Sequence, residues 1–268
     1  MSETVPLDLS VDRVRVFLDG EIVGSLTLSP AKTVAFSYES SWLSSGFSIS
    51  PLSLPLREGV FVAKRDPLHG LFGAFDDSMP DGWGRLLTDR LLRQRGIDPY
   101  SIGTLTRLSI VGSSGMGALE YEPAADIENG VAATDLDDIA RECANLLETD
   151  FSEDLDQLFA LGGSSGGARP KILTEVDGEE WIIKFPSSVD SANIGEQEYQ
   201  ISVLARECGI DMPETRLFAS AQCSGYFGVR RFDRTRDDDG TEHKVHMISA
   251  GGLLETSHRI PNLDYGLL

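Results

Sequence analysis

The chain has 268 residues and a formal net charge of −20, from 43 acidic and 23 basic side chains. Its length suggests about two domains, and 41% hydrophobic with 25% charged residues is typical of a globular chain. The acidity excludes a broad basic face for nucleic acid, because binding to phosphates requires clustered lysine and arginine. No apolar run is long enough to span a membrane, so we expect no membrane insertion.

We also expect no export signal. The first residues, MSETVPLDLS, contain neither a basic nor an apolar segment and do not predict a secretory signal. The three cysteines are widely spaced and predict neither a metal site nor a disulfide framework: Cys143, Cys208 and Cys223. They favour a reducing, cytoplasmic location with mostly buried thiols.

The first part of the chain predicts a small β-rich unit. Two alternating segments, 14–18 and 22–26, flank Asp19-Gly20, a strong hairpin turn. Residues 33–38 alternate as a third strand. Residues 85–93 predict an amphipathic helix. We expect its arginines to be solvated, and they form a local basic exception in an otherwise acidic chain.

The middle of the chain holds a glycine-rich segment. It follows an acidic stretch rich in small residues, which predicts a linker over 123–133, and helical patterns over 135–148 and 155–161. Residues 162–171 then read GGSSGGARPK. Four glycines allow backbone N–H groups to approach an anion closely, although a flexible linker or a hairpin end has the same composition. The segment is neither a Walker loop nor a Rossmann fingerprint.

A hairpin and a helix follow. Residues 171–176 and 181–186 predict two strands joined by the turn at 177–178. Lys184 lies inside the apolar second strand, where an ammonium group needs a partner or a ligand unless it reaches water from an edge strand. Residues 196–208 predict a helix, with an apolar face made of Ile201, Leu204, Ala205 and Cys208.

Two acidic residues near the start of this helix are candidate partners of Lys184. Glu198 and Glu196 both lie close to the apolar face, and periodicity barely separates them. Either is equally compatible with a solvated acid in the first turn, where it complements the helix dipole. Two more strands are expected near 215–219 and 226–232.

This order of elements matches the outline of a protein-kinase small lobe, in which a glycine loop covers the phosphates and a helix glutamate holds a strand lysine beside them. Several segments resemble the HipA family of bacterial toxin serine/threonine kinases: GGSSGGARPK, IIKFP, EQEYQISVLARECGI, VRRFDR, FLDGEIVGSL, FDDSMPDGWGRLL and GSSGMGALEYEP. The resemblance implies an α+β fold. It places a β-rich N-terminal subdomain over 1–122 and a truncated, kinase-like small lobe of antiparallel sheet plus helix over 134–268, with no large lobe.

The resemblance also implies roles for particular residues. Lys184 would bind the ATP phosphates, and alignment with the family, rather than periodicity, prefers Glu198 as its helix partner. Ser164 matches the loop serine that these kinases autophosphorylate, with Ser165 as an adjacent possibility. The implied nucleotide-binding positions are Lys184, the phosphate loop Gly162, Gly163, Ser164, Ser165, Gly166 and Gly167, and the adenine hinge Arg231, Phe232 and Asp233.

The implied function is that of the toxin of a type II toxin–antitoxin system. Such a kinase uses ATP and Mg²⁺ to phosphorylate a serine in a translation protein, typically an aminoacyl-tRNA synthetase. Its usual partner is a HipB-like DNA-binding antitoxin. Because a charge of −20 repels phosphate, we expect this chain to contact DNA only through that partner.

The family's catalytic loop is not found in this sequence. None of the four histidines begins the pattern H-x-x-D-x-x-x-x-N, and Asp264-Tyr265-Gly266 imitates the metal-binding D-F-G without a catalytic loop before it. We therefore expect no metal ligands and no kinase activity from this polypeptide alone. The alternatives are a non-catalytic module that binds an antitoxin or regulatory partner, and a transferase of another kinase-like family.

Overall fold

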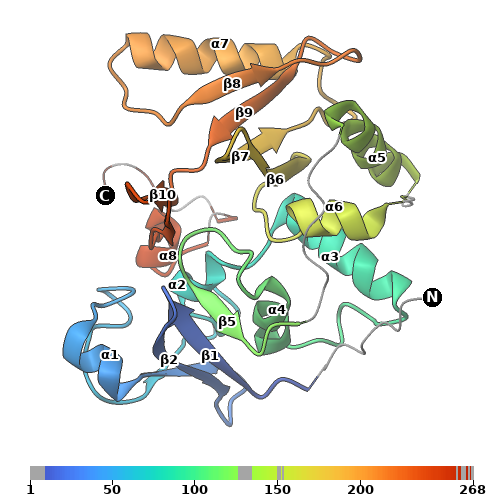
Figure 1. Ribbon diagram of the computed structural model, residues 1–268. Helices are drawn as coiled ribbons and strands as arrows, with labels where there is room; N and C mark the ends of the chain where they lie inside the picture. The colour runs from blue at the N-terminus through green and yellow to red at the C-terminus, as the bar shows by residue number, and fades with distance from the viewer. Residues whose placement is uncertain are drawn as a thin grey trace. The chain divides into compact units, whose positions relative to one another are not determined.

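The computed structural model describes residues 10–125, 135–149, 152, 154–257, 259–260, 264 and 266. The chain forms two compact units, each built from helices and antiparallel sheet (Figure 1). One unit contains Met1–Met79, Tyr100–Asp126 and Thr235–Leu268, and the other contains Pro80–Pro99 and Ile127–Arg234. The mixed α and β composition agrees with the expected fold class.

The first unit is organised around a five-stranded sheet in the order β4-β3-β2-β1-β5. The predicted hairpin at Asp19-Gly20 is confirmed, and both turn residues have positive φ angles. Aromatic rings fill the core, where the centroids of Phe36 and Phe75 lie 5.3 Å apart. The strands are β1 Arg13–Leu18, β2 Glu21–Leu28, β3 Val34–Tyr38, β4 Phe61–Val62 and β5 Glu120–Glu122, and the helices are α1 Ser40–Ser45, α2 Gly73–Asp76, α4 Thr104–Val111 and α8 Ala250–Leu253.

Residues from the last part of the chain complete this unit. After the β10 Arg234–Arg236 and β11 Glu242–Lys244 pair, the chain returns to contact α2 and the residue that follows it. The Gly73 amide donates to Glu255 Oε1 at 2.9 Å, and Ser249 Oγ donates to Asp77 Oδ1 at 2.7 Å. The units are thus discontinuous in sequence, whereas the sequence-based division treats each as one stretch. Most of its linker lies outside the described residues.

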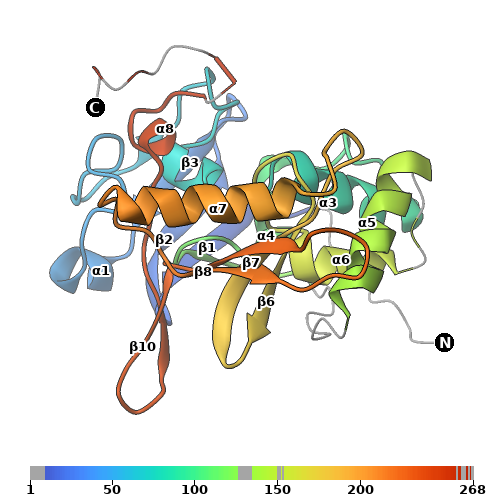
Figure 2. The same cartoon turned by 90° about the horizontal axis from the view of Figure 1, so that it is seen from above.

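The second unit holds a four-stranded antiparallel sheet in the order β6-β7-β9-β8, crossed on one face by α7 (Figure 2). The hairpin predicted around residues 177–178 is confirmed. Helices α3 and α6 pack side by side in the same unit. The elements are α3 Gly82–Gln94, α5 Leu136–Thr149, α6 Leu155–Gly162, β6 Lys171–Val176, β7 Glu179–Lys184, α7 Ile194–Glu207, β8 Thr215–Phe218 and β9 Tyr226–Arg230.

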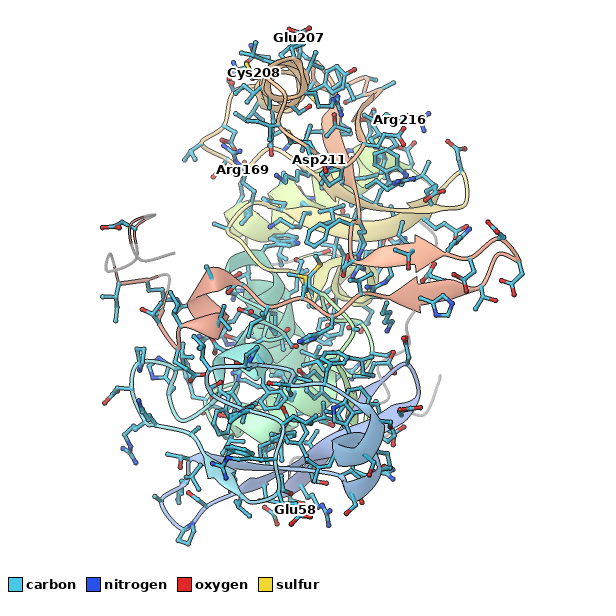
Figure 3. All side chains as sticks on the ribbon, turned by 90° about the vertical axis from the view of Figure 1, so that its left-hand side faces the viewer. Glu58, Arg169, Glu207, Cys208, Asp211 and Arg216 are labelled. Atoms are coloured by element: carbon cyan, nitrogen blue, oxygen red, sulfur yellow. The ribbon has the colours of Figure 1, made fainter. Side chains whose placement is uncertain are left out.

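The apolar face predicted for α7 is not buried as its spacing indicates. Ile201 and Leu204 are 66% and 57% exposed, and Cys208 lies at the exposed end of the helix (Figure 3). The buried residues of α7 are instead Gly195 and Ser202. Ser202 shares a hydrogen bond of 2.8 Å with Thr215 on β8, so the helix contacts the sheet through its small and polar side.

Two further expectations concern the burial of the cysteine thiols and membrane insertion. Cys143 is buried as expected, Cys223 is partly buried and Cys208 is not. None of the helices in the described part of the chain combines the length and the apolar character that crossing a bilayer requires.

Candidate functional site

An ion pair between β7 and α7 forms the centre of the candidate site. The Lys184 ammonium donates to Glu198 Oε1, and the two side chains are 29% and 28% exposed. The same ammonium lies 5.1 Å from the centroid of the Phe227 ring on β9. Because β7 lies between β6 and β9, Lys184 is not on an edge strand. The acid that pairs with it is Glu198 rather than Glu196.

Arg169 adds a second cation to this acid. Its guanidinium lies 3.8 Å from Glu198 Oε2 and 2.9 Å from Asp190 Oδ1. Asp190 also accepts hydrogen bonds from the hydroxyl and the amide of Ser187, and these donors, followed by Arg169, hold its pKa below the ordinary value. Glu198 is therefore shared between a strand lysine and a loop arginine, which fixes the direction of its carboxylate.

Lys171 is a third cation, and its place beside Lys184 was not predicted. It pairs directly with Lys184 across the β6–β7 hairpin, is almost fully buried, and donates from Nζ to the Gly166 carbonyl at 2.6 Å. Burial, followed by repulsion from Lys184, lowers its pKa to about 8, against the opposing effect of Asp81. The signal was available, because a two-residue turn at 177–178 places 171 opposite 184.

The glycine loop connects α6 to β6 and has a defined conformation. Helix α6 ends at Gly162, whose carbonyl accepts from the Ser165 amide at 3.0 Å and from the Ser165 hydroxyl at 2.6 Å. Ser165 is buried, whereas Ser164 is partly exposed. Further along, the Gly167 amide donates to Asp81 Oδ1. The predicted helix begins only at residue 85, and nothing in the sequence pattern indicated that Asp81 contacts this loop.

The segment after β9, expected to be an adenine hinge, is held by a buried ion pair. Arg231 donates from Nε and from its terminal nitrogen to the Asp233 carboxylate, at 3.0 and 2.7 Å. Arg234 donates to the same carboxylate at 2.8 Å. Phe232, in contrast, is 58% exposed. These two arginines and the aspartate thus fix the backbone of the segment, and the phenylalanine ring stays outside the core.

The donors gathered near Lys184 suit a phosphate group. Two lysines and an arginine supply positive charge, and the glycine-rich backbone supplies N–H groups that can approach closely. Among the residues that the structure describes, no three histidine, cysteine or acidic side chains gather to hold a metal ion. The central residue of Asp264-Tyr265-Gly266 lies outside the described residues.

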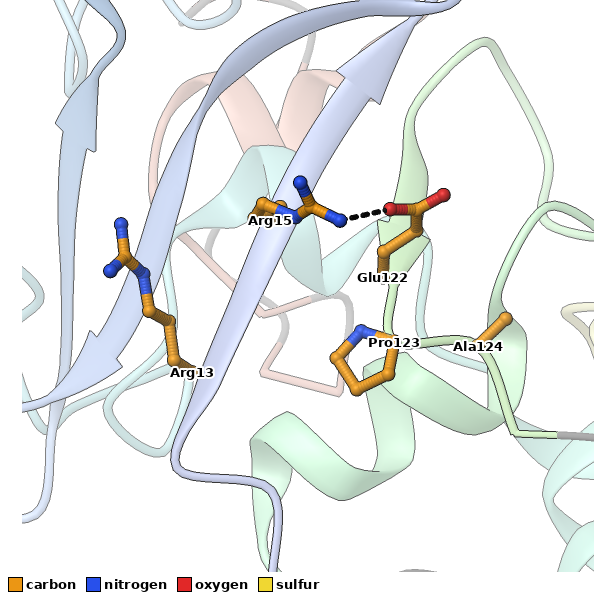
Figure 4. A pocket seen from close by; sticks show the side chains of 5 residues that line it. All are labelled: Arg13, Arg15, Glu122, Pro123 and Ala124. Atoms are coloured by element: carbon orange, nitrogen blue, oxygen red, sulfur yellow. Dashed lines mark hydrogen bonds and ion pairs between the residues drawn. The ribbon is translucent and has the colours of Figure 1, made fainter.

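A separate hollow lies in the first unit. It has a volume of about 580 Å³ and opens beside β1 and the end of β5 (Figure 4). Arg15 crosses it to reach Glu122 at 2.7 Å, while Arg13 turns to Ser25 at 3.0 Å. Both arginines are engaged by partners within the unit.

Comparison with known proteins gives matches over both units. A model of the HipA N-terminal domain matches residues 14–122, and a model of the HipA-like C-terminal domain matches residues 163–266. The protein named "Putative kinase Y4mE" of Sinorhizobium fredii is 27% identical over 264 residues, covering 89% of this chain and 58% of its own length.

A solved structure shares the fold. It is a chain from the complex of the toxin–antitoxin system HipA, HipB and operator DNA of Shewanella oneidensis MR-1. The TM-score is 0.63 at 18% identity, with 91% of this chain and 57% of that chain covered. This chain therefore spans less than two thirds of the length of either protein. The two domain matches together extend over most of its sequence, and the chain belongs to the HipA family.

Proposed function

We propose that this chain provides the nucleotide-phosphate site of a HipA-type serine/threonine protein kinase, the toxin of a type II toxin–antitoxin system. The observation that carries the proposal is the ion pair between Lys184, on the hairpin that follows the glycine loop, and Glu198 on α7. A lysine on a central strand, held by a helix glutamate, is the arrangement that kinases use to bind ATP phosphates.

The physical role of each group follows from its contacts. Glu198 holds the Lys184 ammonium in one direction, so that little side-chain entropy is lost when a phosphate binds. Arg169 would supply further donors, together with backbone N–H groups of the glycine loop other than those of Gly163, Ser165 and Gly167, which donate within the chain. Charge-assisted hydrogen bonds to phosphate are the strong ones. In this proposal the backbone of residues 231–233 contacts the adenine, and Ser164, the more exposed loop serine, is the residue that is autophosphorylated.

The partner and the substrate follow from the family. The solved relative was obtained with HipB and operator DNA, and we propose a HipB-like antitoxin as the partner of this protein. DNA would then be reached through that partner, because the chain carries a net charge of −20. The proposed substrate is a serine hydroxyl in a translation protein such as an aminoacyl-tRNA synthetase.

Isothermal titration with a non-hydrolysable ATP analogue tests the proposal without requiring catalysis. The wild-type chain should bind the analogue, and Lys184→Met should weaken binding about ten-fold or more, because a charge-assisted contact to phosphate is lost. Lys64→Met, at an exposed lysine of the first unit, is the matched control and should bind like wild type.

Two outcomes would contradict this function. Absence of analogue binding by the wild-type chain, with retention of a HipB-like protein in a pull-down, would favour a non-catalytic binding module. Equal affinity of wild type and Lys184→Met would remove Lys184 from the nucleotide site.

A further inference from the structure

The glycine loop is held by a segment of the second unit that precedes it by 86 residues. The Gly167 amide donates to the Asp81 carboxylate, and the Gly167 carbonyl accepts from the Trp83 amide at 2.9 Å. The Trp83 indole N–H donates to the Lys171 carbonyl at 3.1 Å, at the point where the loop becomes β6. The segment Asp81–Gly84 therefore contacts both the tip of the loop and its end.

Two glycines make this close approach possible. A Cβ atom at Gly82 would lie 2.4 Å from the Gly167 carbonyl oxygen, and a Cβ atom at Gly84 would lie 2.2 Å from the Ser165 carbonyl oxygen. Both distances are far shorter than a van der Waals contact. The backbone at the start of α3 thus packs directly on the backbone of the loop, with no side chain between them.

Lys171 on β6 also holds the loop. Its ammonium donates to the Gly166 carbonyl, the residue next to the one that Asp81 and Trp83 hold. Consecutive residues of the loop are therefore fixed from two elements, α3 and β6. Lys171 is in turn the cross-strand neighbour of Lys184, so these contacts place the tip of the loop next to the lysines of the proposed phosphate site.

We propose that Asp81–Gly84 is the positioning element of the glycine loop, which holds the loop backbone in its ligand-binding conformation and thereby sets the affinity for nucleotide phosphates. The inference rests on the proposed function. Its physical basis is entropic. Glycine loses more backbone freedom on ordering than any other residue, and this segment contains four. Contacts that order it before the ligand arrives remove that cost from binding.

The test uses Asp81 variants of the whole chain, with two measurements. Hydrogen exchange of the loop amides, without nucleotide, reports how well the loop is held. Titration with the non-hydrolysable ATP analogue reports affinity. Asp81→Ala removes the acceptor for the Gly167 amide and should raise loop exchange and weaken the analogue about ten-fold. Asp81→Asn keeps an acceptor oxygen and should restore most of both properties.

Asp156→Ala is the matched control. This exposed aspartate on α6 belongs to the same unit and pairs with Arg95 at 3.4 Å, so it removes one charge without touching the loop. It should leave both measurements unchanged.

Each outcome distinguishes the inference from the proposed function. If wild type binds the analogue and Asp81→Ala matches it in exchange and affinity, the inference is overturned. Tighter binding by Asp81→Ala also overturns it, because the carboxylate would then compete with phosphate for the Gly167 amide. If wild type binds no analogue, the proposed function fails together with the predicted effect on affinity, and the exchange data alone show whether Asp81 holds the loop.

Discussion

Two glycines at opposite ends of α3 allow the close approach to the loop to be tested through stability. Gly82 begins the helix with a φ angle of +43°, and Gly96 follows its end with a φ angle of +75°. Alanine is strained at both positions, by about 1–2 kcal/mol for a left-handed backbone. A Cβ atom at Gly96 meets nothing within 4 Å, whereas at Gly82 it lies 2.4 Å from the Gly167 carbonyl oxygen. Alanine therefore has the same kind of backbone strain at both positions, but only at Gly82 would its Cβ atom clash with the loop.

The clash should make Gly82→Ala the more costly substitution. Overpacking of this kind costs about 1–3 kcal/mol, so we expect Gly82→Ala to lower the free energy of unfolding by that much more than Gly96→Ala does. Urea unfolding, followed by tryptophan fluorescence and circular dichroism, measures the difference when the m-values agree. Equal midpoints for the two variants would refute the direct contact between the start of α3 and the glycine loop.

Three further predictions concern charged or titrating groups. Asp233→Asn removes the carboxylate that two buried arginines share and should cost about 3–5 kcal/mol in urea unfolding, whereas Glu179→Gln, at an exposed pair, should cost less than about 1 kcal/mol. Burial lowers the pKa of His246, which donates to the Ile49 carbonyl. The unfolded chain therefore takes up this proton first as the pH falls, and the melting temperature should drop below about pH 6.5, less steeply in His246→Asn. Ser164→Asp adds a negative charge to the proposed phosphate loop and should weaken the ATP analogue in titration, and unchanged affinity would contradict the placement of the loop.

Local sequence signals predicted most of the elements of the second unit. The turn at Asp177-Gly178 determined the register of the β6–β7 hairpin, because a two-residue connection allows little choice. The helix carrying Glu198 was predicted within two residues of its observed bounds, Ile194–Glu207. Periodicity could not decide between Glu198 and Glu196, since both lie in the first turns of the helix. The sheet decided it, because the Lys184 ammonium contacts only one of the two in the described contacts.

The burial of α7 could not be predicted from its hydrophobic pattern. Ile201 and Leu204 follow the spacing of a buried face but remain exposed, because the helix approaches the sheet through Gly195 and Ser202. A Cβ atom at Gly195 would lie 2.2 Å from the Gly225 carbonyl oxygen. A close approach of two backbones requires glycine, and this requirement outweighed the apolar stripe in setting the orientation of the helix.

The conformation of the glycine loop was equally hidden, because the residues that hold it are distant in sequence. Composition indicated a flexible, anion-binding segment, and nothing within residues 162–171 shows that the loop is held by Asp81 and Trp83. Helix propensity alone disfavours the glycines of DGWG by about 1 kcal/mol each. Gly82 has a positive φ angle that favours glycine, whereas Gly84 is explained by its close approach to the Ser165 carbonyl oxygen. Glycines with low helix propensity at the start of a helix thus marked a tertiary contact.

The direct pairing of Lys171 with Lys184 supports an anion site by a separate argument. Like charges opposite each other on neighbouring strands destabilise a sheet, and burial adds a desolvation cost that lowers the pKa of Lys171 to about 8. The chain has an acidic excess of 20 charges, yet Lys184 and Arg169 share the Glu198 carboxylate, and Lys171 lies directly opposite Lys184 on the neighbouring strand. A bound phosphate would relieve the repulsion and raise the pKa of Lys171. Binding of the ATP analogue at pH 8 should therefore take up protons, seen as a dependence of the titration enthalpy on the buffer, and Lys171→Met should abolish that dependence.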